Sequence, residues 1–131
     1  MKFLLDTSVF LWSLDADHRL NTRAKEILTR PSSELYFSAV SSWEIAIKFA
    51  LGSLPLPNAP SEFIPLALRS WAVRPFDITH EHAWRAGELP LHHRDPFDRM
   101  LIAQALTEKM TLLTADRAFQ VYKVDLIFCG K

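Results

Sequence analysis

The sequence predicts an α/β protein with a small, mostly parallel β-sheet between layers of helices. Short apolar runs alternate with amphipathic stretches along the whole chain, which is the pattern of strands joined by crossover helices. The first run, Phe3-Leu4-Leu5, has no polar alternation, as expected of a strand buried on both faces. No repeat or long linker divides the 131 residues, and 49% of them are apolar. We therefore expect one domain over residues 1–131 with a substantial core.

The first half of the chain contains two of these strands, each followed by helical segments. We expect a strand over residues 2–6, a turn into a helix at 7–12, a helix at 22–29, a strand at 34–38 and a helix at 41–51. Asn21 has the side chain of a helix N-cap, and Pro31 ends the helix that follows it. Ile45 and Phe49 repeat at helical spacing, and Gly52 ends their helix.

The second half continues the alternation after a proline-rich loop at residues 54–60. We expect a helix at 61–71 despite its internal proline, a strand at 73–78, a helix at 79–87, a loop at 89–94, a helix that begins within 95–98, and strands at 111–114 and 124–128. Thr79 is the expected N-cap of the helix at 79–87. Asp95 has N-cap chemistry, Pro96 suits the first helical position, and Asp98 falls at the third.

Four acidic residues stand where a parallel sheet would bring them together. Asp6 and Asp116 each close an apolar run, while Glu44 and Asp98 lie just inside the start of predicted helices. Parallel sheets bind ligands at the carboxyl ends of their strands, so we expect these four candidate catalytic and metal-binding residues to meet at one rim. Gathered carboxylates raise each other's pKa values unless a cation neutralises them. Hard oxygen ligands without His or Cys at metal spacing favour Mg²⁺ or Mn²⁺, and the implied reaction is phosphodiester hydrolysis.

Each acid also has a purely structural explanation. Ser41 and Glu44 have capping-box spacing, and for Glu44 alone this is the better interpretation. The helix dipole favours an acid such as Asp98 in the first turn. Asp6 could be a buried turn residue, and Asp116 could begin a short helix. The combination therefore carries more weight than any one acid.

Other polar residues flank these acids. Asp95 could support the site or be an extra ligand, but the N-cap role before Pro96 is favoured, so it is left outside the core set. Thr7 and Ser8 could orient Asp6 or a metal-bound water, or simply begin a helix. Lys48, four residues after Glu44, fits an ion pair, with a phosphate contact as the alternative.

Basic and aromatic side chains near these segments have weaker signals. Arginines that flank the acids could bind a phosphate or be solvated surface residues: Arg94, Arg99 and Arg117. His92 and His93 could relay protons, but they lie in a polar loop and are expected to have no role in the site. The tryptophans favour core or subunit-interface packing over base stacking: Trp12, Trp43, Trp71 and Trp84.

Composition narrows the functional class. The formal net charge is zero, so any binding of nucleic acid must depend on local basic clusters. The lone Cys129 cannot form an internal disulfide and is expected to be a small buried hydrophobe in a reducing cytoplasm. No signal-peptide pattern opens the chain and no apolar run reaches membrane-spanning length. We expect a cytoplasmic protein without a membrane partner.

The ordered set of motifs resembles the PIN-domain family, and within it the VapC toxin group, over essentially the full chain. The matching segments are Phe3-Leu4-Leu5-Asp6-Thr7-Ser8, Ser38-Ala39-Val40-Ser41-Ser42-Trp43-Glu44-Ile45-Ala46-Ile47-Lys48, Asp95-Pro96-Phe97-Asp98-Arg99-Met100-Leu101-Ile102-Ala103-Gln104-Ala105, Leu113-Thr114-Ala115-Asp116 and Val121-Tyr122-Lys123-Val124. The motifs are specific in combination, although each alone is weak.

This resemblance implies a PIN-like three-layer domain and a Mg²⁺- or Mn²⁺-dependent endoribonuclease of a type II toxin-antitoxin pair. It implies RNA as substrate, a VapB-like antitoxin whose tail covers the acidic site, and a homodimer or higher assembly. Asp6, Glu44, Asp98 and Asp116 match the acidic positions of the family.

Three other classes compete with this interpretation. One is a catalytically silent PIN-like module that binds RNA or protein, but all four acids are retained. A phosphatase of the haloacid dehalogenase type would need a second Asp where Ser8 stands. A receiver domain would need adjacent early acids rather than a lone Asp6.

Overall fold

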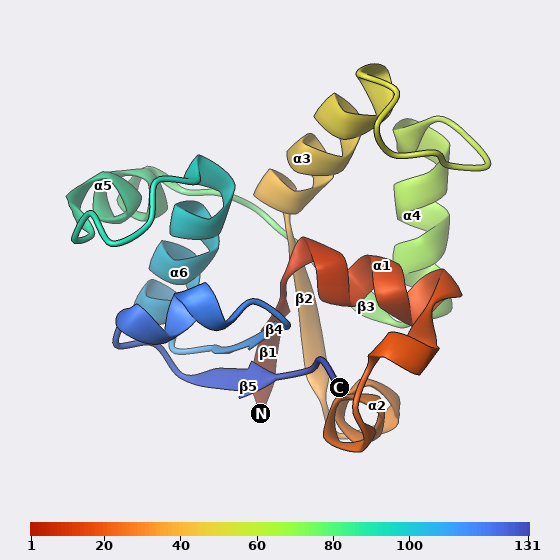
Figure 1. Cartoon of the computed structure of the whole chain (residues 1–131), viewed down its shortest axis with the longest axis horizontal. Coiled ribbons are helices and arrows are strands. Elements are labelled where there is room, and N and C mark those ends of the chain that lie inside the picture. The colour runs from red at the N-terminus through yellow and green to blue at the C-terminus, as the bar shows by residue number, and fades with distance from the viewer.

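A computed structural model describes residues 1–131 and has one five-stranded sheet at its centre (Figure 1). The strands are β1 (Lys2–Leu5), β2 (Glu34–Ser38), β3 (Val73–Phe76), β4 (Thr111–Thr114) and β5 (Leu126–Phe128). Their order is β3-β2-β1-β4-β5, and every neighbouring pair is parallel. The predicted parallel sheet is therefore confirmed, with all five carboxyl ends at one rim.

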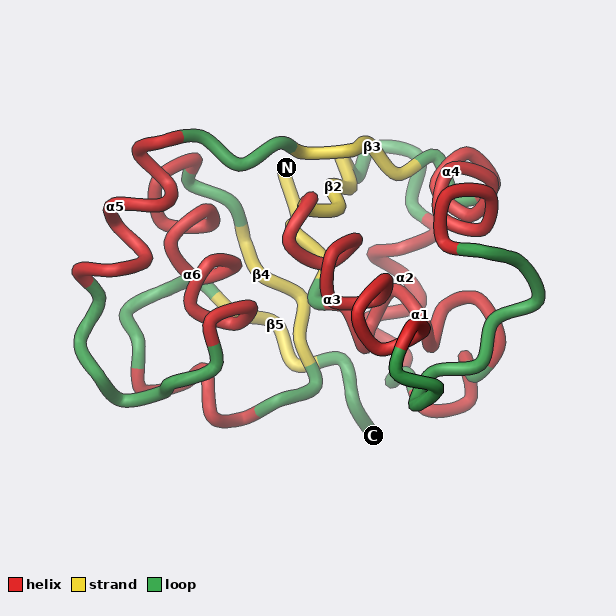
Figure 2. Tube along the Cα trace, turned by 90° about the horizontal axis from the view of Figure 1, so that it is seen from above, coloured by secondary structure: helices red, strands yellow, loops and turns green.

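Helices connect these strands and cover both faces of the sheet. They are α1 (Thr7–Asp15), α2 (Thr22–Thr29), α3 (Ala39–Ala50), α4 (Pro60–Ser70), α5 (His80–Glu88) and α6 (Pro96–Glu108), with short 3₁₀ segments η1 (Asp17–Arg19) and η2 (Arg117–Val121). In the view from above, α5 and α6 lie on one side of the strands, and α1 and α4 lie on the other (Figure 2).

Side chains of the central strand alternate between two cores. Phe3 and Leu5 point into a core built with α1, α2 and α4, whereas Leu4 points into one built with α6 and η2. Because successive strand residues face opposite sides, an uninterrupted apolar run places apolar groups in both cores. The strand buried on both faces that Phe3-Leu4-Leu5 predicted is thus confirmed, and so is the α/β fold with a sheet between layers of helices.

Local capping signals located most helix starts correctly. Asn21 accepts a hydrogen bond from the Ala24 N–H at 2.8 Å, and Thr79 forms a capping box with His82. Asp95 Oδ1 accepts from the N–H of Phe97 at 2.9 Å. Each cap satisfies N–H groups that the first helical turn leaves without partners.

The start of α3 differs from the prediction. The helix begins at Ala39, and its N-cap is Ser38, whose Oγ accepts from the Val40 N–H at 3.1 Å. The predicted start at Ser41 is wrong because β2 ends at Ser38 and leads directly into the helix. Glu44 consequently lies in the second turn and not at the capping-box position.

Several expected strands and helices differ at their ends by a few residues. The strands at 2–6, 73–78 and 124–128 are shorter than expected, and the helix expected to begin within 7–12 extends to Asp15. Cys129 is buried and unpaired, as expected. No helix combines the length and the apolar character needed to cross a membrane.

Candidate active site

The pairing of β1 with β4 brings the first and last of the four acids to one rim. Leu5 is in register with Leu113, and the Asp6 N–H donates to the Leu113 carbonyl at 2.9 Å. Asp6 follows β1 and is the residue before α1, while Asp116 follows β4 and precedes η2. Their proximity therefore follows from strand register.

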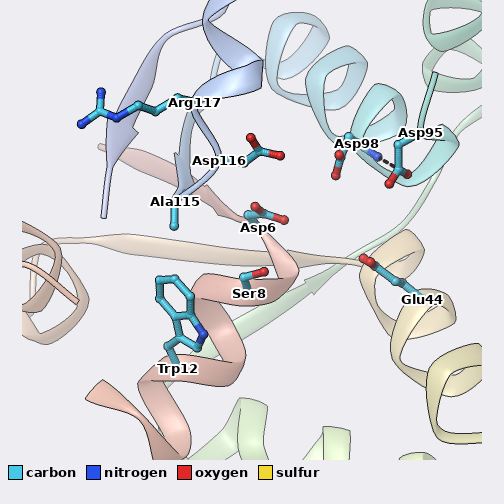
Figure 3. A pocket seen from close by; sticks show the side chains of 9 residues that line it. All are labelled: Asp6, Ser8, Trp12, Glu44, Asp95, Asp98, Ala115, Asp116 and Arg117. Carbon is cyan, nitrogen blue, oxygen red and sulfur yellow. Dashed lines mark hydrogen bonds between the residues drawn. The ribbon is translucent and has the colours of Figure 1, made fainter. Parts of the chain in front are cut away.

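The other two acids reach the same rim from helices. Glu44 extends from α3 and Asp98 from the first turn of α6, and both point toward the space beside Asp6 (Figure 3). The acids line a cleft of about 390 Å³. Its complete lining is Asp6, Ser8, Trp12, Glu44, Asp95, Asp98, Ala115, Asp116 and Arg117. The predicted convergence of acids from four separate segments is thus present in the structure.

Asp6 is the most buried acid of the cleft, with 7% of its surface exposed. Burial raises its pKa from 3.8 to about 7, and the charges of Asp98 and Glu44 act in the same direction. The Thr114 hydroxyl opposes this rise by donating to Asp6 Oδ2 at 2.8 Å. Burial costs the carboxylate its hydration, and one side-chain donor does not replace it.

Asp98 has the second perturbed carboxyl group. Burial raises its pKa from 3.8 to about 6, and the charges of Asp95 and Glu44 add to the rise. His93 opposes the rise, because its Nε2 lies 2.6 Å from Asp98 Oδ2. Since Glu44 contributes to the shifts of both Asp6 and Asp98, these carboxylates form one electrostatic group.

Glu44 is held from two directions. Thr7 Oγ1 donates to Glu44 Oε1 at 2.7 Å, and the Lys48 ammonium contacts Oε2 at 2.7 Å. The ion pair with Lys48 was predicted. Thr7 begins α1, which was one of its two predicted roles, but its hydroxyl contacts Glu44 and not Asp6. The hydrogen bond with Glu44 raises the pKa of Lys48, with smaller contributions from Asp95 and Asp98. The capping-box explanation for Glu44 is wrong, so its orientation depends on tertiary contacts.

Asp95 and Asp116 combine capping with a place in the cleft. Asp95 caps α6, as predicted, and also lines the cleft. Asp116 Oδ1 accepts from the Ala118 N–H at 2.9 Å, and its side chain is exposed. An N-cap uses one carboxylate oxygen, so the other remains free for a further contact.

The structure corrects two expectations about basic side chains. His93 is not a bystander: atoms of His93, Asp98 and Asp116 that could bind a metal all lie within 4.8 Å of one another. Arg99 is buried, and its guanidinium donates to main-chain carbonyls rather than facing solvent. Neither contact has a local signal in the sequence, because both depend on the path of the 89–95 loop.

The remaining flanking residues occupy different environments. Arg117 lies at the end of the cleft, with its guanidinium directed away from the acids (Figure 3) and 4.6 Å above the Phe128 ring. Trp43 is 60% exposed beside Glu44, and Trp84 is also exposed. Of the two predicted environments, packing in the core is thus wrong for Trp43 and Trp84, and packing at a subunit interface stays a prediction for them.

The donor set of the cleft fits a divalent cation. Asp6, Glu44, Asp95, Asp98 and Asp116 present carboxylates there, and Arg117 is the one basic residue in the lining. Raised pKa values at Asp6 and Asp98 mean that ionising this group is unfavourable in the protein alone. A bound cation would offset that cost, and oxygen ligands suit a hard ion.

Comparison with known proteins identifies the family of this chain. The family model described as PIN domain matches residues 3–124, which contain all four predicted acids. The chain belongs to the PIN domain family. Within it, the chain is similar to Ribonuclease VapC16 of Mycobacterium tuberculosis, with 36% identity over 69 residues, or 53% of this chain and 48% of the relative. It thus matches about half the length of that curated relative.

Solved structures confirm the PIN fold. VapBC2 from Rickettsia felis, bound to a promoter DNA fragment, matches with a TM-score of 0.75 and 14% identity over 99% of this chain and 100% of the other. VapBC-1 from nontypeable Haemophilus influenzae matches with a TM-score of 0.65 and 20% identity over 98% of each chain. At these identities the likeness establishes the shared fold.

Proposed function

We propose that this PIN domain is a metal-dependent endoribonuclease and acts as the toxin of a VapBC-type toxin-antitoxin pair. The observation that carries the proposal is the gathering of Asp6, Glu44, Asp98 and Asp116 in one cleft. The name of the similar Ribonuclease VapC16 supports RNA as the substrate. The VapBC complexes that share the fold support an antitoxin partner and a dimer or larger assembly.

The proposed role of the four acids is to bind Mg²⁺ or Mn²⁺. When bound, such an ion supplies a Lewis acid for the phosphodiester and for the attacking water. The Thr114 hydroxyl donates a hydrogen bond to Asp6, and the Thr7 hydroxyl donates one to Glu44. These two carboxylates are therefore oriented before an ion binds. The all-oxygen set formed by the four acids favours Mg²⁺ or Mn²⁺ over zinc.

The surroundings of the cleft suit a single-stranded nucleic acid. Arg117 lies at one end, where it could bind a phosphate beyond the scissile one. Trp43, the residue before Glu44, lies outside the lining of the cleft; it is exposed and packs edge-on against Phe97 with ring centroids 5.4 Å apart. An exposed aromatic ring next to the acids can stack on an unpaired base, which duplex RNA does not offer.

The antitoxin would bind beside the cleft as well as within it. An apolar groove of about 470 Å³ lies between α1 and α4 and includes Leu14, Leu56 and Phe63. Trp12 lines both this groove and the acidic cleft. A partner segment that combines apolar residues with a basic residue would therefore fill the groove and neutralise the acids.

Controlled expression in a bacterial host tests the proposal. Wild-type protein should arrest growth and generate discrete new RNA 5′ ends in the cytoplasm, whereas Asp98→Asn should do neither. Co-expression of an antitoxin encoded beside this chain should restore growth. Growth arrest by soluble Asp98→Asn, or a wild type that produces no new RNA ends, would favour a catalytically silent binding module instead.

A further inference from the structure

His93 makes a short contact with one oxygen of an acid in the proposed active site. Its Nε2 lies 2.6 Å from Asp98 Oδ2, and the two side chains are 26% and 16% exposed. An ionised carboxylate only accepts hydrogen bonds, so Nε2 carries the proton in this contact. Asp98 Oδ1 accepts no hydrogen bond from the rest of the protein. The imidazole therefore occupies one oxygen and leaves the other available.

The position of His93 is set by two buried side chains. Its N–H donates to the Tyr122 hydroxyl at 2.9 Å, and its carbonyl accepts from Arg99 Nη1 at 3.2 Å. Arg99 and Tyr122 are 8% and 6% exposed. The His93 ring also lies 6.2 Å, between centroids, from the buried Phe119 ring. Arg99 of α6 and Tyr122, directly after η2, thus hold the main chain of His93, and Phe119 of η2 lies beside its ring.

We propose that His93 is a positioning residue that fixes the Asp98 carboxylate, through Nε2–H and Oδ2, so that Oδ1 is directed to the divalent cation. This inference rests on the proposed metal-dependent function. A carboxylate can rotate about its Cβ–Cγ bond, and a donor on one oxygen restricts that rotation. Hydrogen bonds of this kind orient metal ligands in proteins and strengthen metal binding.

The geometry favours positioning over direct metal binding by His93. Neighbouring ligands of an octahedral ion with bonds of about 2.1 Å lie roughly 3 Å apart. The 2.6 Å separation between His93 Nε2 and Asp98 Oδ2 is shorter and matches a charge-assisted hydrogen bond. Asp116, also in this cluster, remains available as a carboxylate ligand.

Binding of Mn²⁺ to four purified variants tests this role. The signal of free Mn²⁺ in electron paramagnetic resonance gives the affinity without any RNA. We expect His93→Ala to weaken Mn²⁺ binding by about 10- to 100-fold. His93→Gln should retain most of the affinity because its amide nitrogen reaches the place of Nε2, whereas the shorter His93→Asn should not. His92→Ala is the matched control and should keep the wild-type affinity. His92 is exposed, and its ring packs against Tyr122 and not against an acid of the cleft.

Pulsed electron paramagnetic resonance of bound Mn²⁺ distinguishes a positioning role of His93 from direct coordination of the ion by its imidazole. A positioning role predicts no directly bonded imidazole nitrogen in the wild type. Equal Mn²⁺ affinity of wild type and His93→Ala would overturn the inference, and so would a nitrogen coupling that disappears in that variant. If His93→Ala does not fold, equal affinities of the Gln and Asn variants would overturn it. A folded wild type that binds no Mn²⁺ would instead contradict the proposed metal site itself.

Discussion

Thr114 Oγ1 donates a hydrogen bond of 2.8 Å to Asp6 Oδ2, although the two residues are 108 positions apart. Thr114 Oγ1 also accepts a hydrogen bond of 3.0 Å from the Asp116 N–H. One buried hydroxyl at the end of β4 thus connects two of the proposed metal-binding acids. The contact with Asp6 follows from the parallel pairing of β1 and β4, which places Asp6 beside the end of β4. The contact with Asp116 is local, because the two residues are two positions apart.

Replacing Thr114 tests this connection. Thr114→Val keeps the shape but leaves Asp6 Oδ2 without its donor and the Asp116 N–H without its acceptor. We expect a loss of about 1–3 kcal/mol in the free energy of unfolding and weaker Mn²⁺ binding at pH 7, because the Asp6 pKa rises further. Thr114→Ser retains the hydroxyl and should bind Mn²⁺ nearly as the wild type does. Equal Mn²⁺ affinities of the Val and Ser variants would exclude the role of the hydroxyl.

The raised pKa of Asp6 predicts a specific dependence of stability on pH in metal-free protein. Its carboxyl group has a pKa of about 7 when folded, against 3.8 for the ordinary side chain. Between these values folding takes up a proton, so the contribution of Asp6 to stability falls as pH rises and levels off above about pH 7. Asp6→Asn removes the free-energy cost of ionising a buried carboxyl group, while the amide oxygen of Asn can still accept the hydrogen bond from Thr114. In EDTA, the variant should need more urea to unfold than wild type at pH 8.

The comparison with acid pH provides the control for this prediction. Near pH 4 the Asp6 carboxyl group of the folded wild type is protonated, so the stability gain of Asp6→Asn should disappear. A gain of the same size at both pH values would show that ionisation of Asp6 is not its cause.

Arg99 is predicted to be a structural residue rather than a phosphate-binding one. Its guanidinium donates between 2.8 and 3.2 Å to the carbonyls of Ala86, Leu89, Pro90 and His93. We expect Arg99→Met to lower the free energy of unfolding by about 3 kcal/mol or more, because these buried carbonyls lose charged donors. The exposed Arg94→Met should change it by less than about 0.5 kcal/mol. Urea unfolding of both variants measures the difference, and similar values would refute the structural role.

Metal binding should stabilise the folded protein. At 100 times its dissociation constant, Mn²⁺ would add about 2.7 kcal/mol to the free energy of unfolding by mass action. The thermal midpoint of wild type should therefore rise with Mn²⁺, and that rise should be largely lost in Asp98→Asn. Asp125→Asn removes an exposed acid at the amino end of β5, on the rim of the sheet opposite the cleft, and should keep the wild-type response. An equal rise in all three proteins would indicate nonspecific binding.

Local sequence rules were sufficient for the helix starts at Asn21, Thr79 and Asp95. Each cap bonds to N–H groups two or three residues away, so its chemistry is visible in a few letters of sequence. The same rules were insufficient at α3, where Ser38 and Ser41 both precede helix-forming residues. The end of β2 decides between them, and that boundary depends on pairing with distant strands.

Topology explains why the four acids could be predicted together and why their partners could not. Parallel strands bring Asp6 and Asp116 to the same rim wherever the loops run. His93 reaches Asp98 only because Arg99 and Tyr122 hold the preceding loop in place. Thr7 contacts Glu44 only because α1 approaches α3. These contacts require the tertiary structure.

The central claim is that the clustered carboxylates make RNA cleavage depend on a divalent cation. The most direct test measures initial rates of cleavage of a single-stranded RNA oligonucleotide as Mn²⁺ is titrated into metal-free protein. We predict saturable activation in wild type and Asp125→Asn, and a loss of at least about 100-fold in Asp98→Asn, whose amide removes the ligand charge. Cleavage that persists in EDTA, or that is unchanged in Asp98→Asn, would contradict the claim.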